Sequence, residues 1–286
     1  MPIRYDELVA RNVPDVVQSY DHRDTILYAL GLGLGLDRDD PCYLRYVYGR
    51  EPAVVPTMAA VLAQARDWYA EPDVGVDFAN GVHGEHQIVF HKPLPGRATV
   101  IGKARVADVI DKGPGRSAVI VTTSDLFDRD THELYASSTQ SVFFRKDGGC
   151  GGPGKTSART HAMPERPPDV SVLQRTTAQT ALIYRLSGDE NPLHADPVFA
   201  RTAGFEQPIL HGLATFGISA YAVIRTYFPD QPWRMKSIGC RFTAPAFPGD
   251  TLRVDLWREG EGISFRTIAH EHGVTIADHG VVALAA

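Results

Sequence analysis

The sequence predicts an α+β fold made of two related domains, and three observations lead to that prediction. A glycine-rich break at residues 146–155 divides the chain of 286 residues into halves of similar size. Each half contains one apolar, helix-like run after a proline, followed by short runs of β-prone residues. The halves also share the similar segments 90–96 and 242–249, which both run from a phenylalanine through prolines to a glycine. One helix followed by an antiparallel meander, used twice, is typical of an α+β chain with two repeats.

The individual elements are predicted in chain order. Each half is expected to contain one helix and two strands, at 56–68, 98–107 and 117–123, and then at 208–222, 251–257 and 263–268. The clustered glycines of 146–155 cannot lie inside regular structure, and a polar, proline-rich stretch follows them. We therefore expect a first domain over 1–147, a linker over 148–168 and a second domain over 169–286.

The composition excludes several classes of protein. A net charge of -5, with 43% hydrophobic and 22% charged residues, is typical of a globular protein. The sequence contains no run of basic residues that would indicate binding to nucleic acid. No apolar stretch reaches the roughly 20 residues of a membrane helix. The first residues lack a signal-peptide core and the last five are not a peroxisomal address. Together with three widely spaced cysteines, Cys42, Cys150 and Cys240, these features predict a cytoplasmic protein with reduced thiols.

The stretch 184–197 contains the most chemical information in the chain. Asp189, Asn191 and His194 place a carboxylate, an amide and an imidazole within six residues, and Pro192 stiffens the turn between them. An Asp and a His held rigidly together can share one water and move its protons. A purely structural interpretation is also open, in which Asp189 caps a helix and His194 packs at the surface. Asn191 can equally close an Asx-turn before the proline.

The second candidate segment begins at Pro208 and continues as an apolar run. It indicates a buried helix whose first amides are free to bind a developing negative charge, with Gly212 near its start. Gly212 can also be a helix-start glycine chosen for backbone freedom, and His211 is expected to be a structural partner of its own loop. In the first half, 21–28 occupies the place that we assign to the motif, and Pro56-Thr57 replaces His211-Gly212. The first half is therefore expected to be catalytically silent.

These residues resemble a known family. Residues 184–197 fit a known sequence pattern without a gap. The pattern consists of an aromatic residue, any two residues, Ser/Thr-Gly-Asp, any one residue, Asn-Pro-Leu/Ile-His, any one residue, and Asp-Pro. It is the hydratase 2 motif of the MaoC-like dehydratase family, the R-specific enoyl-CoA hydratases. Further segments resemble the eukaryotic-type two-domain members: 83–85, 92–95, 106–113, 241–242 and 248–250. The resemblance implies two hot-dog domains, each an antiparallel sheet wrapped around a central helix.

The resemblance also implies roles for individual residues. Asp189 and His194 would hold the reacting water, with Asn191 supporting the dyad or the thioester, and the amide of Gly212 would bind the thioester oxygen. The matching segments of the family approach coenzyme A across the two halves. The residues concerned are His83, Gly84, Lys112, Arg241 and Phe242. The implied activity is hydration of trans-2-enoyl-CoA to (3R)-3-hydroxyacyl-CoA, or the reverse, by a homodimer in fatty-acid metabolism. Coenzyme A would enter only as part of the substrate, without a separate cofactor.

Two other activities remain open at this point: a hot-dog acyl-CoA thioesterase and a non-catalytic acyl-CoA-binding subunit. Three further patterns are set aside. The glycines of 31–35 lack the spacing of a dinucleotide fingerprint, and the histidines of 270–279 are expected to face solvent. His194, Asp196 and His211 match no strong metal pattern, so no metal is expected. Finally, the small residues of 29–36 and 57–65, including Gly33 and Ala60, are expected to open a tunnel for the acyl chain.

Overall fold

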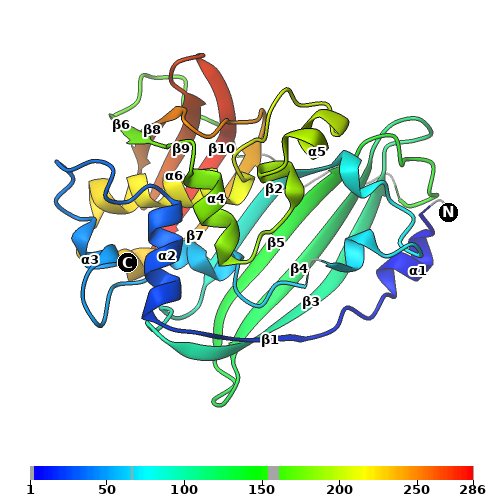
Figure 1. Cartoon of the computed structure of the whole chain (residues 1–286), viewed down its shortest axis with the longest axis horizontal. Helices are drawn as coiled ribbons and strands as arrows, with labels where there is room; N and C mark the ends of the chain where they lie inside the picture. Colours follow the sequence, from blue (N-terminus) through cyan, green and yellow to red (C-terminus); the bar gives the residue numbers. More distant parts are fainter. Residues whose placement is uncertain (1–2, 66, 154–160, 286) are drawn as a thin grey trace.

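One antiparallel sheet runs through the part of the chain that the computed structural model describes, residues 3–65, 67–153 and 161–285 (Figure 1). It has ten strands in the order β1-β3-β4-β5-β2-β7-β10-β9-β8-β6. The strands are β1 Val16–Tyr20, β2 Gly81–Phe90, β3 Ala98–Asp111, β4 Ala118–Asp128, β5 Leu134–Phe144, β6 Val170–Arg175, β7 Met235–Phe242, β8 Thr251–Glu259, β9 Gly262–Ala269 and β10 Val274–Leu284. Short α- and 3-10 helices accompany them: α1 Tyr5–Val9, α2 His22–Gly31, α3 Leu44–Val47, η1 Pro56–Ala60, η2 Asp67–Ala70, η3 Phe78–Asn80, α4 Thr180–Tyr184, η4 Arg185–Ser187, η5 Pro192–His194, α5 Pro197–Thr202 and η6 Pro232–Arg234. The remaining helix, α6 Gly212–Tyr227, is the longest of those described.

The two halves contribute equivalent parts of this sheet. The first half supplies β1-β3-β4-β5-β2, the second supplies β6-β8-β9-β10-β7, and β2 pairs with β7 at the seam. Glu85 pairs with Arg241 and Val89 pairs with Ser237, so exchange of the halves maps one pair onto the other. The α+β class is therefore observed, with two repeats joined edge to edge. Residues 154–160 of the expected linker lie outside the described residues.

Helix α6 fills the concave side of the second half. Twelve consecutive residues, Leu213–Ile224, are buried, as expected for a helix that is apolar on all sides. It contacts β6, β7, β8 and β9, and also η1 of the first half. The helix begins at Gly212 and not at Pro208, because the amide of Leu210 donates to the carbonyl of Ala246 at 2.7 Å and holds the preceding segment extended.

The helix predicted over 56–68 is wrong. The short helix η1 forms at its start, the chain then turns at Ala63, where φ is 48°, and the separate helix η2 begins at Asp67. Two contacts from outside the segment explain the turn. The amide of Ala63 donates to Oε1 of Gln18 at 2.6 Å. Gly102 on β3 allows close approach, since a Cβ there would lie 1.9 Å from the carbonyl oxygen of Ala63. Tertiary contacts with β1 and β3 thus override a helix-like pattern.

Helix α2 packs against α4, and this contact corrects two expectations. Asp21 caps α2 through the amide of Arg23, and the rings of Tyr28 and Tyr184 lie 5.7 Å apart. In both halves these helices follow the first strand, so the catalytic motif corresponds to the segment after α2 and not to residues 21–28. The tunnel expected at 29–36 and 57–65 is not supported either, because Gln64 is the one residue of these two segments that lines either of the cavities described below. Gly33, with φ of 81°, packs tightly against the carbonyl of Arg175, since a Cβ at this position would lie 2.8 Å from the carbonyl oxygen.

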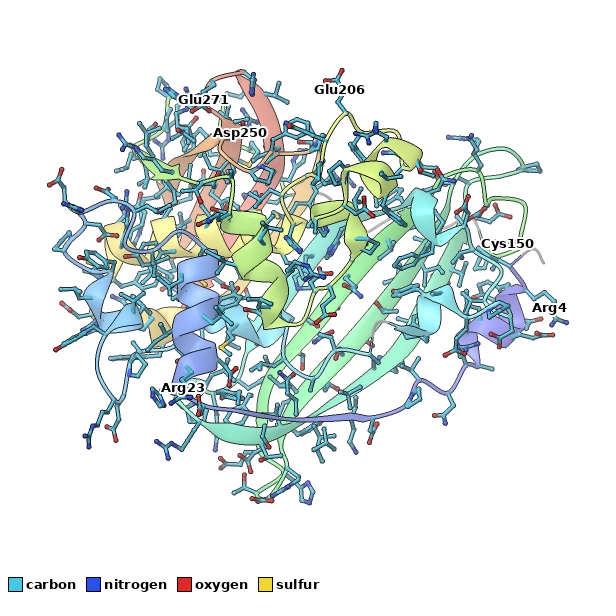
Figure 2. All side chains as sticks on the ribbon, in the orientation of Figure 1. Arg4, Arg23, Cys150, Glu206, Asp250 and Glu271 are labelled. Atoms are coloured by element: carbon cyan, nitrogen blue, oxygen red, sulfur yellow. The ribbon has the colours of Figure 1, made fainter. Side chains whose placement is uncertain are left out.

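The glycine-rich segment lies at the far end of the sheet. Gly152 lies against the carbonyl of Val109 and the ring of Tyr5, and Cys150 packs against the same hydrophobic cluster; Figure 2 labels Cys150 at this end of the molecule. Cys42, Cys150 and Cys240 are all free thiols. Among the described residues, no helix combines the length and apolar character needed to cross a membrane.

Candidate active site

A cavity of about 750 Å³ lies where the motif, the start of α6 and the first half meet. The second half contributes the loop of 188–194, Gly212, Leu213, Phe242 and residues that follow β7. The first half contributes the beginning of β2 and the end of β5. A cavity of this size, with a mostly apolar wall and a few polar groups, is typical of small-molecule sites.

The motif forms a tight loop between η4 and α5. Gly188 turns the chain with φ of 111°, a left-handed conformation that favours glycine. The side-chain oxygen of Asn191 accepts the amide of Leu193 at 3.0 Å and caps the short helix η5. Asn191 therefore closes the Asx-turn that the sequence allowed, and a direct contact with substrate stays a prediction.

The loop presents Asp189 and His194 to the cavity. Nδ1 of His194 lies 2.9 Å from the carbonyl oxygen of Ile209, so in the neutral ring this nitrogen carries the proton and Nε2 accepts. One polar side-chain atom each of Asp189, His194 and His211 lies within 4.8 Å of the others. Two groups at such a separation can share one water, because each hydrogen bond spans about 2.8 Å. The dyad geometry thus suits proton transfer through water.

His211 supports this geometry through contacts with both members of the dyad. It is fully buried, and its ring stacks on His194 with centroids 3.7 Å apart and planes inclined by 26°. Nε2 of His211 lies 3.1 Å from the carbonyl oxygen of Asp189, to which it donates. The residue therefore holds the motif loop, and not only its own loop as the sequence suggested. The three side chains are close enough to ligate a metal ion, and metal-free chemistry remains a prediction.

Gly212 is the first residue of α6 and lines the cavity. The first amides of a helix have no partner within it, and the helix dipole makes this end attractive to negative charge. His211 precedes it as N-cap with extended ψ of 134°. A Cβ on Gly212 would lie 3.5 Å from the ring of Phe242, which is an ordinary contact. Steric crowding alone therefore does not require glycine here.

The residues predicted to bind coenzyme A fall into two groups. His83 and Phe242 line the cavity, with ring centroids 5.0 Å apart. Gly84, Lys112 and Arg241 are not among the described residues of the lining. A role for these three in binding the substrate inside the cavity is therefore not supported, and contact outside it stays a prediction.

Long-range contacts hold Gly84 and Arg241 elsewhere, and a local hairpin contact holds Lys112. Gly84 sits at a register shift of β2, where a Cβ would lie 2.1 Å from the ring of Phe143. Nε of Arg241 donates to Glu85 across the seam at 2.8 Å. Lys112 follows β3, and its amide donates to the carbonyl of Ser117 at 3.1 Å.

The sequence did not indicate several residues of the lining. They come from the first half and include Gln64, Tyr69, Val142, Phe144 and Arg145. Arg145 directly follows β5 and is exposed, so it offers a cation at the cavity. A single arginine at a strand end has no sequence signal of its own. The antiparallel pairing of β5 with β2 brings it to the cavity, where its amide donates to the carbonyl of Asn80 at 3.4 Å.

The comparisons with known proteins agree over nearly the whole chain. Residues 159–279 match the model of the MaoC like domain, and residues 18–146 match that of the MFE-2 hydratase 2 N-terminal domain. The chain is 38% identical over 285 residues to peroxisomal multifunctional enzyme type 2 of Mus musculus, covering 96% of this chain and 38% of the mouse protein. It thus spans about two fifths of that relative.

Two further relatives are similar in length to this chain. It is 34% identical over 287 residues to "Enoyl-CoA hydratase 2, peroxisomal" of Arabidopsis thaliana, covering 95% of this chain and 92% of the plant protein. The crystal structure of a MaoC-like dehydratase from Phytophthora capsici superposes with a TM-score of 0.85 at 30% identity, covering 99% and 98% of the two chains. The expected fold of two hot-dog repeats is confirmed.

Proposed function

The chain belongs to the family of MaoC-like enzymes that contains the enoyl-CoA hydratases 2, and on this premise we propose that it hydrates trans-2-enoyl-CoA to (3R)-3-hydroxyacyl-CoA or catalyses the reverse dehydration. One observation carries the proposal: Asp189, His194 and the amide of Gly212 meet at one cavity. An acid–base pair beside an anion-binding helix start suits the addition of water to an activated thioester.

The proposed reaction uses the conjugation of the substrate. In a trans-2-enoyl thioester the carbonyl withdraws electrons from the double bond, so the β-carbon is electrophilic. A water held between Asp189 and His194 attacks that carbon, and the dyad takes up one of its protons. The electron pair of the double bond shifts toward the thioester oxygen and forms an enolate. Return of one proton from the dyad to the α-carbon then gives the 3-hydroxyacyl product, with one C–O and one C–H bond formed.

The start of α6 supplies the complementary charge. The amide of Gly212 would donate to the thioester oxygen as negative charge collects there. A preorganised donor of this kind stabilises a transition state by about 3 kcal/mol. Because the two dyad members share one water, the proposal assigns proton uptake to the pair and not to one of its members.

Two other activities make different predictions for the same protein. A thioesterase would direct water to the carbonyl carbon and release free thiol, and a binding subunit would leave the thioester unchanged. Mixing the protein with crotonyl-CoA and a longer enoyl-CoA separates the three outcomes. We expect loss of enoyl absorbance without free thiol. Release of thiol, or no change in either signal, would contradict hydration.

The configuration of the product tests the family assignment more closely. Chiral analysis, or coupling to enantiomer-specific hydroxyacyl-CoA dehydrogenases, should detect the 3R alcohol. A predominantly 3S product would be incompatible with an R-specific hydratase.

Assembly and location are separate proposals. We propose a homodimer, which the exposed side chains of Leu30, Leu182 and Leu186 on the packed helices α2, α4 and η4 support. Light scattering after size exclusion should give twice the 31.3 kDa of the chain. The names of the mouse and Arabidopsis relatives do not support the cytoplasmic location expected from the sequence. Cell fractionation with a peroxisomal marker would distinguish the two compartments.

A further inference from the structure

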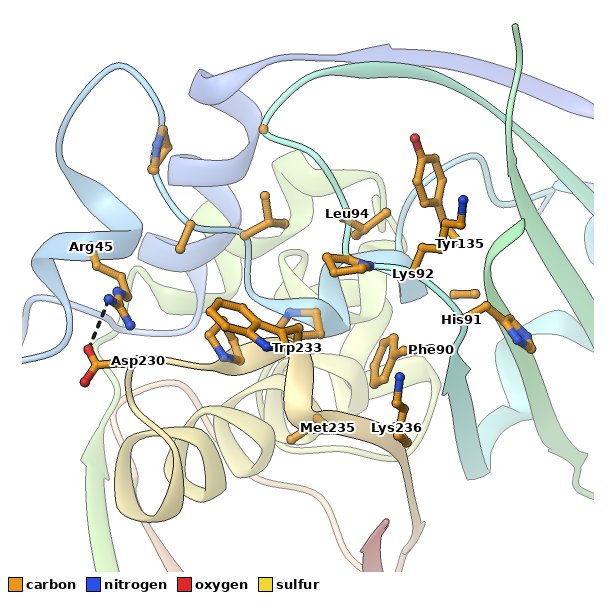
Figure 3. A pocket seen from close by; sticks show the side chains of 18 residues that line it. Arg45, Phe90, His91, Lys92, Leu94, Tyr135, Asp230, Trp233, Met235 and Lys236 are labelled. Carbon is orange, nitrogen blue, oxygen red and sulfur yellow. Dashed lines mark ion pairs between the residues drawn. The ribbon is translucent and has the colours of Figure 1, made fainter. Parts of the chain in front are cut away.

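A second cavity, of about 370 Å³, lies at the opposite end of the seam between the halves (Figure 3). The first cavity is lined by the start of β2 and the end of β7, whereas the second is lined by the end of β2 and the start of β7. Its lining includes Arg45, Phe90, Lys92, Tyr135, Trp233 and Lys236. None of these residues belongs to the site described above.

The two cavities are equivalent under exchange of the halves. Phe90 pairs with Ala136 in the first half, and Phe242 pairs with Ala277 in the second. The next residue repeats one backbone bond in each half, since His91 donates to Tyr135 at 2.8 Å and Thr243 donates to Ile276 at 3.0 Å. The second cavity therefore stands where a second active site would lie if both repeats had kept one.

The second cavity lacks the catalytic groups. Helix η1 has Val55 as N-cap and Pro56 as its first residue, just as α6 has His211 and Gly212. Proline has no backbone N–H, so no donor is available at the position that corresponds to the Gly212 amide. In place of the motif loop, the wall contains Arg45 and the apolar residues Pro52, Ala53 and Val54. The chemistry of this lining suits binding without hydration.

The second cavity combines flat apolar surfaces with positive charge. The side chain of Trp233 is 55% exposed, which is unusual for a large aromatic ring, and Phe90 forms part of the same wall. Figure 3 shows Trp233 between the Arg45–Asp230 ion pair on one side and Lys92 and Lys236 on the other. Lys92 pairs with Glu133. Among the described residues Lys236 has no carboxylate partner, so its ammonium group is available to a ligand.

We propose that this cavity binds a nucleoside diphosphate, for which ADP serves as the probe. The base would stack on the indole of Trp233, which accepts any nucleobase face. The phosphates would lie toward Lys236, since lysine binds phosphate as a mobile point charge, with Lys92 close by. A fatty acid would instead need a closed apolar channel, whereas this wall carries Arg45 and Lys92, paired with Asp230 and Glu133, and Lys236, which has no such partner among the described residues. The inference does not depend on the hydration reaction.

Titration with ADP tests this site directly. Calorimetry measures the affinity, and quenching of tryptophan fluorescence reports the location, with Trp68 and Trp257 as the remaining emitters. We expect ADP to quench the wild type but not Trp233→Phe, which keeps a flat ring for binding. Lys236→Glu should weaken ADP binding at least tenfold. Lys103→Glu changes the same charge on β3, away from this cavity, and should bind ADP like the wild type.

Three ligands and one control variant define the outcomes that would overturn the proposal. Adenosine and inorganic pyrophosphate should each bind at least tenfold more weakly than ADP, because each keeps only one of the two contacts. Pyrophosphate as tight as ADP would mean an anion site without base stacking. Decanoate tighter than ADP would mean an acyl site. Quenching that persists in Trp233→Phe, or equal affinity in Lys236→Glu and Lys103→Glu, would place the nucleotide elsewhere.

Discussion

The two halves have the same order of strands, but the helices beside the sheet differ between them. In the second half α6 runs for 16 residues and begins with Gly212, whereas the first half has only the five residues of η1, beginning with Pro56. The motif loop is present in the second half alone. A repeated scaffold can therefore be kept by its strand pairing while the helix start and one loop decide where chemistry takes place.

The largest expected difference between the halves concerns the dyad. Asp189→Asn and His194→Gln should each lower turnover of enoyl-CoA at least about a hundredfold, the usual scale for lost acid–base catalysis. Asp21→Asn makes the same substitution in the first half, at a residue outside the cavity. Asp21 caps α2, and asparagine caps equally well, so this variant should keep its turnover. Steady-state kinetics with crotonyl-CoA measures all three, and near-normal turnover of either dyad variant would refute the assignment.

A second change would make the two helix starts alike. Gly212→Pro removes the amide that Pro56 lacks, and proline is well accepted at the first position of a helix. Turnover should fall about a hundredfold to a thousandfold while circular dichroism stays unchanged, as for loss of one oxyanion donor.

Gly212→Ala is the control for this change, because it keeps the amide. Its Cβ would meet Phe242 at 3.5 Å, an ordinary contact, so turnover should stay within a few-fold of the wild type. An equal loss in the alanine and proline variants would show that space, and not the amide, matters at this position.

The third prediction concerns the contribution of the silent half to specificity. Val142 on β5 lines the cavity opposite the motif loop, and each buried CH₂ of an acyl chain contributes up to about 0.8 kcal/mol. Val142→Phe should therefore reduce kcat/KM for decenoyl-CoA at least about tenfold more than for crotonyl-CoA. Val89→Phe makes the same substitution on β2, outside the cavity, and should affect neither substrate. Equal losses for both substrates with Val142→Phe would remove the first half from chain-length selection.

The smallest effect is expected on the free energy of unfolding, at Asp111, whose carboxylate accepts hydrogen bonds from the glycine-rich segment. The pKa of Asp111 is lowered because the amides of Gly149, Gly113 and Gly151 donate to its carboxylate. A depressed pKa stabilises the fold above the ordinary Asp value near 3.9 and this stabilisation is lost as pH falls through the folded pKa. Asp111→Asn should lower the free energy of unfolding at pH 7 by about 1 kcal/mol or less, because solvent screens the site.

Urea titrations at several pH values test this prediction. The difference between Asp111→Asn and the wild type should shrink below about pH 4, where the carboxylate of the unfolded wild-type chain begins to protonate while that of the folded chain is still ionised. A difference that is constant down to low pH would assign the effect to shape and not to charge.

The sequence predicted the features that depend on neighbouring residues. The loop of 188–194 and the buried run of α6 lie within short segments, so their composition indicated their structure and place. The failed helix over 56–68 was decided by Gln18 and Gly102, which approach from other strands. The positions of Gly84 and Arg241 likewise depend on Phe143 and Glu85. Contacts between residues far apart in the chain have no local pattern from which they can be read.

The seam between β2 and β7 has a further consequence for what mutation can achieve. If the two repeats were separate identical chains, a two-fold axis through this seam would force both sites to carry the same residues. Any substitution at one helix start would then appear at both, and loss of one donor would mean loss of all activity. Joining the repeats in one polypeptide removes that constraint. Each site can then vary alone, so one can specialise in a new ligand while its twin preserves the reaction.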